Sequence, residues 1–432
     1  MHMPARRSTH LAHATMFLLG WTAVIIPTVI LLVERRFVVS DSGIGAVYFV
    51  NSACYIAGSL GGGPLVERLG RGRAFPAAWL VAGSATIAQG MAPAWSIFLL
   101  SAAAQGLGTG TLMVCANSLI IDAYPATRSN ALSRLHVFYA LGALSGPVVV
   151  TWLVASGMAW QGVLLASGLA GWLLAGLLAL APAPWPVREQ GRAAPPSPPA
   201  RDDAPIRASG EVAPSGTAPA PGTPRSVPRP PSAGHRGPRF TIALVAAAVA
   251  IACYVGSESA VTGWVVRFLS TSHGSTAAVA LTMFWTGLAV GRILASRVVH
   301  RFDLGSVIVA CALAGALGLL LAVLVPGWPP TVALFAVIGL AFGPVYPSIM
   351  SLASGRHPGR SASVSGLMVT AGGFGGLVYP PVVGFLSPIV GLGIGMLGAA
   401  LLIAAAGGLV ALGRPGVSLP ARSASPPPSG TR

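Results

Sequence analysis

Charge is scarce in this sequence. Only 8% of its 432 residues are charged, whereas an ordinary soluble protein has about 25%. Lysine is absent, so all 26 basic residues are arginine, and only 10 residues are acidic. At the same time 54% of the residues are hydrophobic. This composition excludes an ordinary soluble protein and indicates a membrane protein.

Several chemical motifs are also missing. The four cysteines all lie within apolar runs, with the spacing of neither a disulfide framework nor a metal site. There is no phosphate-binding P-loop, and no HExxH motif, acid pair or activated serine indicates an enzyme. The basic residues form no patch interleaved with aromatics. We therefore expect no enzyme activity, no cofactor, no metal and no nucleic-acid partner.

Apolar runs recur along the whole chain. Each has about 20 residues, which is enough for a helix to cross the roughly 30 Å hydrocarbon core of a membrane. The twelve runs are 13–33, 43–65, 74–93, 95–120, 131–155, 160–181, 241–266, 275–298, 304–325, 330–354, 362–386 and 389–412. We expect an all-α membrane protein with twelve transmembrane helices in two six-helix halves.

A polar segment separates these halves. Residues 182–239 are rich in proline, alanine, serine, glycine and arginine and have almost no large apolar residues. Such a segment cannot bury enough surface to fold and should be a flexible linker. We expect a six-helix bundle over 1–181, a second bundle over 240–412, and a disordered tail over 413–432.

The arginines are distributed unevenly about the helices. With both termini on one side, only Arg35, Arg36 and Arg267 fall on the other side. Cytoplasmic loops carry an excess of basic residues, so both termini should lie in the cytoplasm. We expect a monomeric, multi-pass protein of the bacterial plasma (inner) membrane, surrounded by lipid.

The two halves are related in sequence. A constant offset of 233 residues matches features over three helices. The matched pairs include Gly58 with Gly291, Arg68 with Arg301, Gly106 with Gly339, and Gly110 with Gly343. A parallel six-helix repeat joined by a long loop is the plan of transporters with a central site between two halves.

The turn after the second apolar run has a pattern of glycine, acid and arginine. It contains Gly63, Glu67, Arg68, Gly70, Arg71 and Arg73. This turn resembles the signature loop of the major facilitator superfamily, which implies a cytoplasmic gate. Gly63 would let two helices approach closely, Glu67 would hold helix ends or an arginine, and the arginines would bind the anionic leaflet. The alternative is a basic loop without a gate.

Two arginines are candidates for a second gate. Arg301 matches Arg68 in the repeat, within a degenerate copy of the signature turn. Arg292 lies two turns before the end of the eighth apolar run. Its alternatives are a side chain that reaches to the membrane surface and a contact to an anionic substrate.

Glu258 is an acid deep inside an apolar run. A carboxylate at the centre of a bilayer costs about 2.5–3.5 kcal/mol, so such residues usually face a partner or a water-filled cavity. Glu258 is therefore a candidate for binding a proton or a substrate. The alternative is a structural hydrogen bond to the backbone or to Ser257 and Ser259.

A narrower resemblance extends over most of both halves. Its segments include Ala116-Asn117, Leu135-His136 with Tyr139, Tyr254 with Glu258, Phe284-Trp285, and Gly343 with Tyr346. They are similar to the fucose–proton symporter group, which implies proton-coupled transport of a sugar or polyol. Sugar symporters of this group tend to carry a glutamate where this chain has Met113. The first apolar run also lacks a carboxylate, so Glu258 would carry any proton coupling alone.

Other polar and aromatic residues complete the candidate site. Asn51, Gln105 and Asn117 can bind a hydroxylated substrate or hold neighbouring helices together. His136 is a candidate proton relay or a structural residue. Aromatic rings can stack on a sugar or an apolar drug, and the candidates are Tyr139, Tyr254, Trp264, Trp285, Tyr346 and Tyr379.

These features predict a secondary transporter that moves a small organic solute by alternating access. Its direction stays open. The symporter-like segments favour proton-coupled uptake of a sugar-like metabolite, whereas the few polar residues in the helices favour proton-coupled efflux of apolar or amphipathic compounds. A membrane sensor that binds a solute without moving it is an alternative from another class.

Overall fold

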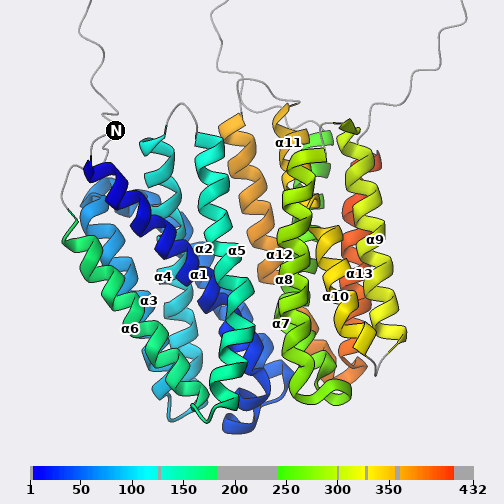
Figure 1. Cartoon of the computed structure of the whole chain (residues 1–432), viewed down its shortest axis with the longest axis horizontal. Coiled ribbons are helices and arrows are strands. Elements are labelled where there is room, and N and C mark those ends of the chain that lie inside the picture. The colour runs from blue at the N-terminus through cyan, green and yellow to red at the C-terminus, as the bar shows by residue number, and fades with distance from the viewer. Residues whose placement is uncertain are drawn as a thin grey trace, which may run out of the picture. The chain divides into compact units, whose positions relative to one another are not determined.

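The structure, a computed structural model, describes residues 3–124, 128–181, 242–298, 301–325, 329–355 and 361–412. The first half contains α1 (Met3–Phe37), α2 (Asp41–Leu69), α3 (Arg71–Met91), α4 (Trp95–Ala123), α5 (Arg128–Ala155) and α6 (Trp160–Ala179). The second half contains α7 (Ile242–His273), α8 (Ala277–Val298), α9 (Leu304–Leu324), α10 (Pro329–Phe342), α11 (Val345–Gly355), α12 (Ser361–Val390) and α13 (Leu392–Leu412), shown in Figure 1. The predicted linker and tail lie outside the described residues.

The helices α10 and α11 are two pieces of one membrane crossing. They are separated at Gly343 and Pro344. Proline has no backbone N–H and disfavours helical geometry in the residue before it. Counting the two pieces as one crossing, the described residues form twelve crossings, as predicted. Eleven of these are long and apolar enough to span a membrane by composition, and α3 is the twelfth.

The first helix is longer than its apolar run. It begins at Met3 and ends at Phe37, so the predicted boundary at residue 33 was wrong. A kink at Val29 (φ −101°, ψ 17°) follows Pro27, because the proline removes a backbone hydrogen bond. Glu34, which lies beyond the apolar run 13–33, is part of the helix.

Each half uses the same three helix pairings. In the first half α2 packs on α4, α1 on α5, and α3 on α6. In the second half α8 packs on α10, α7 on α12, and α9 on α13. The pairs are equivalent in order along the chain. The structure therefore has the internal repeat that the constant offset predicts.

Matched glycines lie where matched helices cross. A Cβ atom at Gly58 would collide with the carbonyl group of Leu107, and a Cβ atom at Gly291 would collide with that of Leu340. Both glycine and leucine thus correspond at the offset of 233 residues. Small residues let helix backbones approach closely within a membrane, so the repeated glycines fix the same crossing in both halves.

The two halves are joined mainly at one end of the bundle. We call it the Arg267 end, and the opposite end, where α1 begins and α13 ends, the Arg71 end. At the Arg267 end the Tyr48 hydroxyl donates to the Gly263 carbonyl oxygen over 2.8 Å. The Ser42 hydroxyl donates to the carbonyl oxygen of Gly384 over 3.3 Å. The Arg267 end is therefore closed by contacts between α2 and the helices α7 and α12.

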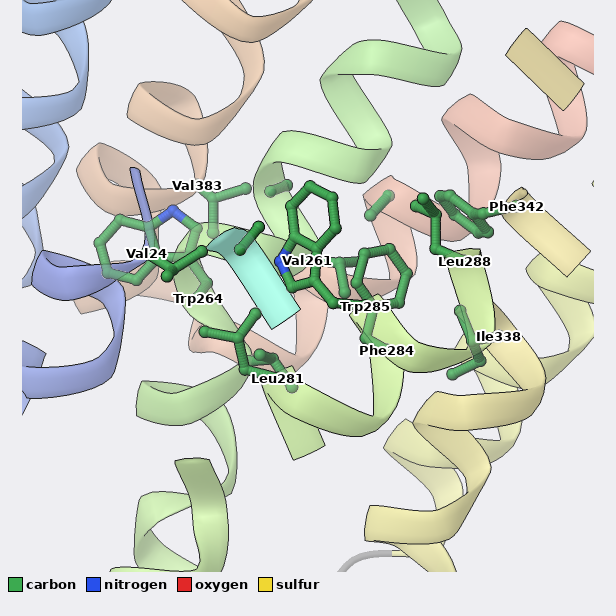
Figure 2. Close-up of a cluster of buried hydrophobic side chains, with 14 of the residues drawn as sticks. Val24, Val261, Trp264, Leu281, Phe284, Trp285, Leu288, Ile338, Phe342 and Val383 are labelled. Carbon is green, nitrogen blue, oxygen red and sulfur yellow. The ribbon is translucent and has the colours of Figure 1, made fainter. Parts of the chain in front are cut away.

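Apolar side chains fill the interior and also cover the outside. The buried cluster in Figure 2 places Trp264 of α7 beside Val24 of α1, and Phe284 of α8 near Phe342 of α10. On the outside, Leu100 is 73% exposed and other leucines are similarly uncovered. An apolar surface of this extent suits contact with lipid, in agreement with a multi-pass membrane protein.

Candidate functional site

Glu258 faces a partner inside the second half. Its Oε1 atom lies 3.7 Å from Nη2 of Arg292 on the neighbouring helix α8. The Glu258 side chain is 15% exposed and the Arg292 side chain 35% exposed. Arg292 was expected at a gate, but the structure places its charged group beside Glu258. A carboxylate and a guanidinium at this distance neutralise one another and remain accessible to a solute.

Two tyrosines lie next to this ion pair. Tyr254 precedes Glu258 by one helical turn and is completely buried. Its hydroxyl group lies within hydrogen-bonding reach of both Glu258 and Arg292. The ring of Tyr346, from α11, lies 6.0 Å from that of Tyr254. The Tyr254 hydroxyl therefore belongs to the same polar cluster as Glu258 and Arg292.

The first half contributes α5 to the same region. The rings of Tyr139 on α5 and Trp285 on α8 are 6.4 Å apart. His136, one turn before Tyr139, is an electrostatic neighbour of Arg292 and is exposed. The indole N–H of Trp285 is buried without a hydrogen-bond partner in the described part of the chain. Residues of both halves therefore lie close together in this region.

Tyr55 of α2 also belongs to this region, although no sequence pattern pointed to it. It is an electrostatic neighbour of Tyr139 and of Tyr346, so it links the two halves. It lies one helical turn after Asn51, which was selected. Asn51 and Tyr55 share a face of α2, so the site lies one turn beyond the selected position on that face.

Asn51 and Gln105 have structural partners instead. The side-chain amide of Asn51 donates to the carbonyl oxygen of Ala102 over 2.9 Å, and that of Gln105 donates to the Thr86 hydroxyl over 3.0 Å. These bonds join α2, α3 and α4 within the first half. Buried amides satisfied in this way hold helices together, so we leave both residues out of the proposed site. Asn117 differs, since its Oδ1 atom is buried without a partner among the described residues.

Two of the aromatic candidates are also held by backbone groups. The indole N–H of Trp264 donates to the Pro380 carbonyl oxygen over 2.9 Å, and the ring is completely buried. The Tyr379 hydroxyl donates to the Gly395 carbonyl oxygen over 2.8 Å. Both bonds anchor α12 to a neighbouring helix. These polar groups are therefore occupied by structural bonds, which we take as the role of both residues.

The predicted gate turn lies at the Arg71 end. Arg71, the first residue of α3, forms an ion pair with Asp122 near the end of α4. Gly70 has a positive φ of 75°, which glycine adopts without strain. A Cβ atom at Gly63 would have open space around it, whereas one at Gly62 would contact α4. The close helix approach expected of Gly63 therefore belongs to Gly62.

The remaining gate candidates share an exposed position. They are Glu67, Arg68, Arg73 and Arg301. Exposed basic residues at a helix end suit contact with anionic lipid headgroups. Within the described ranges no group of three or more histidine, cysteine, aspartate or glutamate residues is arranged to hold a metal ion.

Twelve membrane crossings in two repeated halves, with charged and aromatic groups between them, define a multi-pass membrane transporter. The chain belongs to the Major Facilitator Superfamily, whose sequence profile matches residues 11–380. The wider of the two resemblances seen in the sequence is thereby confirmed.

Comparisons with individual proteins agree with this family. The chain is 30% identical to a glucose/galactose transporter of Brucella abortus biovar 1 (strain 9-941) over 164 residues. That alignment covers 36% of this chain and 38% of the relative, which is less than half of either protein. A protein of the same name from Brucella abortus strain 2308 matches equally well.

Solved structures resemble the fold over nearly the whole chain. A bacterial homologue of the human lysosomal transporter Spinster, in an inward-facing and unoccupied conformation, has a TM-score of 0.69 at 15% identity, covering 96% of this chain and 97% of its own. The nucleoside transporter NupG has a TM-score of 0.65 at 12% identity, covering 95% and 98%. At these identities the likeness defines the fold alone.

Proposed function

We propose that this chain carries a small, neutral, hydroxylated solute such as a sugar by alternating access, and that Glu258 binds the proton that drives it. The observation that carries this proposal is the accessible Glu258–Arg292 pair beside aromatic residues of both halves. Buried charges in a membrane protein usually mark a substrate or ion pathway.

The chemistry of the site favours a hydroxylated solute over an apolar one. Glu258 supplies acceptors and Arg292 supplies donors, while the pair has no net charge. The Tyr254 hydroxyl lies within hydrogen-bonding reach of the pair, and the Trp285 N–H is buried without a partner in the described residues. An apolar ligand would offer no hydrogen bonds to these groups and would leave the Trp285 N–H without a partner, which costs free energy. A sugar would satisfy them and could stack its C–H face on Tyr139 or Trp285.

The ion pair also offers a way to couple protons to the solute. When Glu258 takes up a proton it becomes neutral and no longer attracts Arg292. The guanidinium group then needs another acceptor, which the oxygen atoms of the solute supply. Protonation and solute binding therefore favour one another.

Access to the site is proposed from the Arg71 end. The halves are in contact at the Arg267 end, yet water reaches the side chains of His136 and Arg292. The excess of arginine at the Arg71 end favours a cytoplasmic position for that end by the positive-inside rule. The conformation would then be open to the cytoplasm, in a bacterial plasma membrane. The partial likeness to a glucose/galactose transporter supports a sugar as the solute.

The test uses purified protein in proteoliposomes. Labelled glucose, galactose and fucose are offered with and without an imposed proton gradient, and accumulation is measured. We expect Glu258→Gln to abolish gradient-driven accumulation while leaving part of the exchange of labelled for unlabelled sugar. Asp303→Asn, which removes an exposed acid and keeps a residue that can cap α9, is the matched control and should behave like wild type.

Three outcomes would contradict parts of this proposal. If Glu258→Gln accumulates sugar with the same pH dependence as wild type, Glu258 is not the proton carrier. If sugars are ignored and fluorescent apolar dyes are pumped, the protein is an exporter. If a sugar binds but none crosses the membrane, the protein is a sensor.

A further inference from the structure

Three charged side chains from three helices meet at the Arg267 end. The Nε atom of Arg267 on α7 lies 3.0 Å from Oε2 of Glu34 on α1 and 3.1 Å from Oδ1 of Asp41 on α2. The side chains of Glu34 and Asp41 are only 12% and 11% exposed. A guanidinium Nε carries a single hydrogen atom. The two carboxylates therefore compete for one donor.

The position of this cluster follows from the internal repeat. Glu34 and Arg267 are separated by 233 residues, which is the offset that relates the two halves. Two repeat-equivalent residues can touch only where the pseudo-two-fold axis passes between the halves. The cluster is therefore on the axis, and it must separate whenever the halves open at the Arg267 end.

When both acids are ionised, the cluster of two carboxylates and one guanidinium group has an excess of one negative charge. Asp41 accepts a hydrogen bond from the Ser387 hydroxyl of α12 over 2.8 Å at Oδ2. Its Oδ1 atom is buried and makes no hydrogen bond of good geometry within the described residues. Glu34 and Asp41 are within hydrogen-bonding reach of each other. Two ionised carboxylates at this separation repel one another, and removal from water strengthens the repulsion.

None of the described groups near the cluster donates a hydrogen bond of good geometry to Oδ1 of Asp41. The Tyr48 hydroxyl, from α2, is directed to the carbonyl oxygen of Gly263. Arg35 and Arg36, at the end of α1, are exposed, and Arg36 lies over the ring of Phe37. A proton held between the two carboxylates would supply the missing donor and make the cluster neutral.

We propose that Glu34 and Asp41 bind one proton between them, and that this proton stabilises the closed contact with Arg267. One carboxyl group then donates to the other, while the remaining charge pairs with the guanidinium group. When the halves separate at this end, water solvates both carboxylates and the proton leaves. Closed and open states therefore differ by one bound proton at this site.

The role of this proton differs from that of the proton on Glu258. The cluster lies at one end of the bundle, so its proton enters from and returns to the same side of the membrane. It cannot drive transport. Because the closed state binds more protons, acid on that side favours closure. The site would thus adjust the transport cycle to the pH of one compartment, whatever the solute is.

Infrared spectroscopy of the full chain in lipid nanodiscs tests the bound proton directly. A protonated carboxylic acid has its own C=O stretching band, which an ionised carboxylate lacks. At neutral pH we expect Glu34→Gln and Asp41→Asn each to remove the intensity of one protonated carboxyl group. Glu67→Gln is the control for an exposed acid. Glu258→Gln identifies any band from the central site.

Hydrogen–deuterium exchange supplies a second readout that does not depend on transport. After correction for the intrinsic rate, protection of residues 264–273 and 384–390 should rise in wild type as pH falls, by up to about tenfold per pH unit for one linked proton. In Asp41→Asn this pH dependence should be lost. The proposal is overturned if both variants keep the full infrared band, or if Asp41→Asn keeps the wild-type pH dependence. If one variant does not fold, the other decides.

Discussion

Removing Glu258 or Arg292 alone should lower the free energy of unfolding by more than half of what removing both residues costs. The charges are 3.7 Å apart, which corresponds to about 4 kcal/mol at an effective dielectric constant of about 20. Arg292 is 35% exposed, so solvent screening should reduce the coupling to about 1–2 kcal/mol. Each single substitution, Glu258→Gln or Arg292→Gln, leaves a charge without its partner.

A double-mutant cycle measures this coupling. Unfolding of the four proteins by SDS in mixed micelles, followed by tryptophan fluorescence, gives their free energies of unfolding. We expect each single variant to lose about 1–3 kcal/mol, and the double variant to lose about 1–2 kcal/mol less than the sum. Glu67→Gln and Arg68→Gln form a control cycle, since both residues are exposed. If the losses at Glu258 and Arg292 are additive, the two groups do not interact and the proposed site loses its basis.

Three further substitutions test the packing and the ends of the bundle, again by SDS unfolding. Gly58→Ala should lower the free energy of unfolding by about 1–3 kcal/mol or prevent folding, because its Cβ collides with a carbonyl group of α4. The control Gly61→Ala has open space around its Cβ, so the free energy of unfolding should be unchanged or rise by up to about 1 kcal/mol. Arg71→Ala should lower the free energy of unfolding by about 1–3 kcal/mol, because it leaves a partly buried aspartate without this partner. The control Arg68→Ala should change little, and equal losses in the two variants would contradict a stabilising Arg71–Asp122 ion pair. Tyr379→Phe should lose about 1 kcal/mol for one hydrogen bond and leave solute selectivity unchanged, so a change in selectivity would return this residue to the site.

The sequence predicts the helices because membrane solvation acts locally. About 20 consecutive apolar residues can satisfy their backbone only as a helix in lipid, so each crossing could be assigned without knowing its neighbours. The exceptions have local causes. Pro344 divides one predicted helix into α10 and α11, and α1 continues for one turn beyond its apolar run, so that Glu34 becomes helical.

The candidate site was only partly predictable, since it depends on which faces of the helices meet. Glu258 was selected because its charge is exceptional in an apolar run, and this reasoning needs no partner. Its partner Arg292 is 34 residues away and was assigned to a gate, because a sequence shows how deep an arginine lies but not where it points. Asn51 and Gln105 were equally good candidates by type, yet the structure uses them within the first half.

The sequence by itself determined the class of protein, the number of crossings and the internal repeat, because hydrophobicity and glycine spacing are properties of neighbouring residues. Only the tertiary structure decided which charges are paired. Glu34 and Arg267 occupy equivalent places in the two halves, but their contact exists only because the halves close around a common axis. Helix rotation and the approach of the two halves are long-range properties, and they bring together the groups proposed here to bind the solute and the protons.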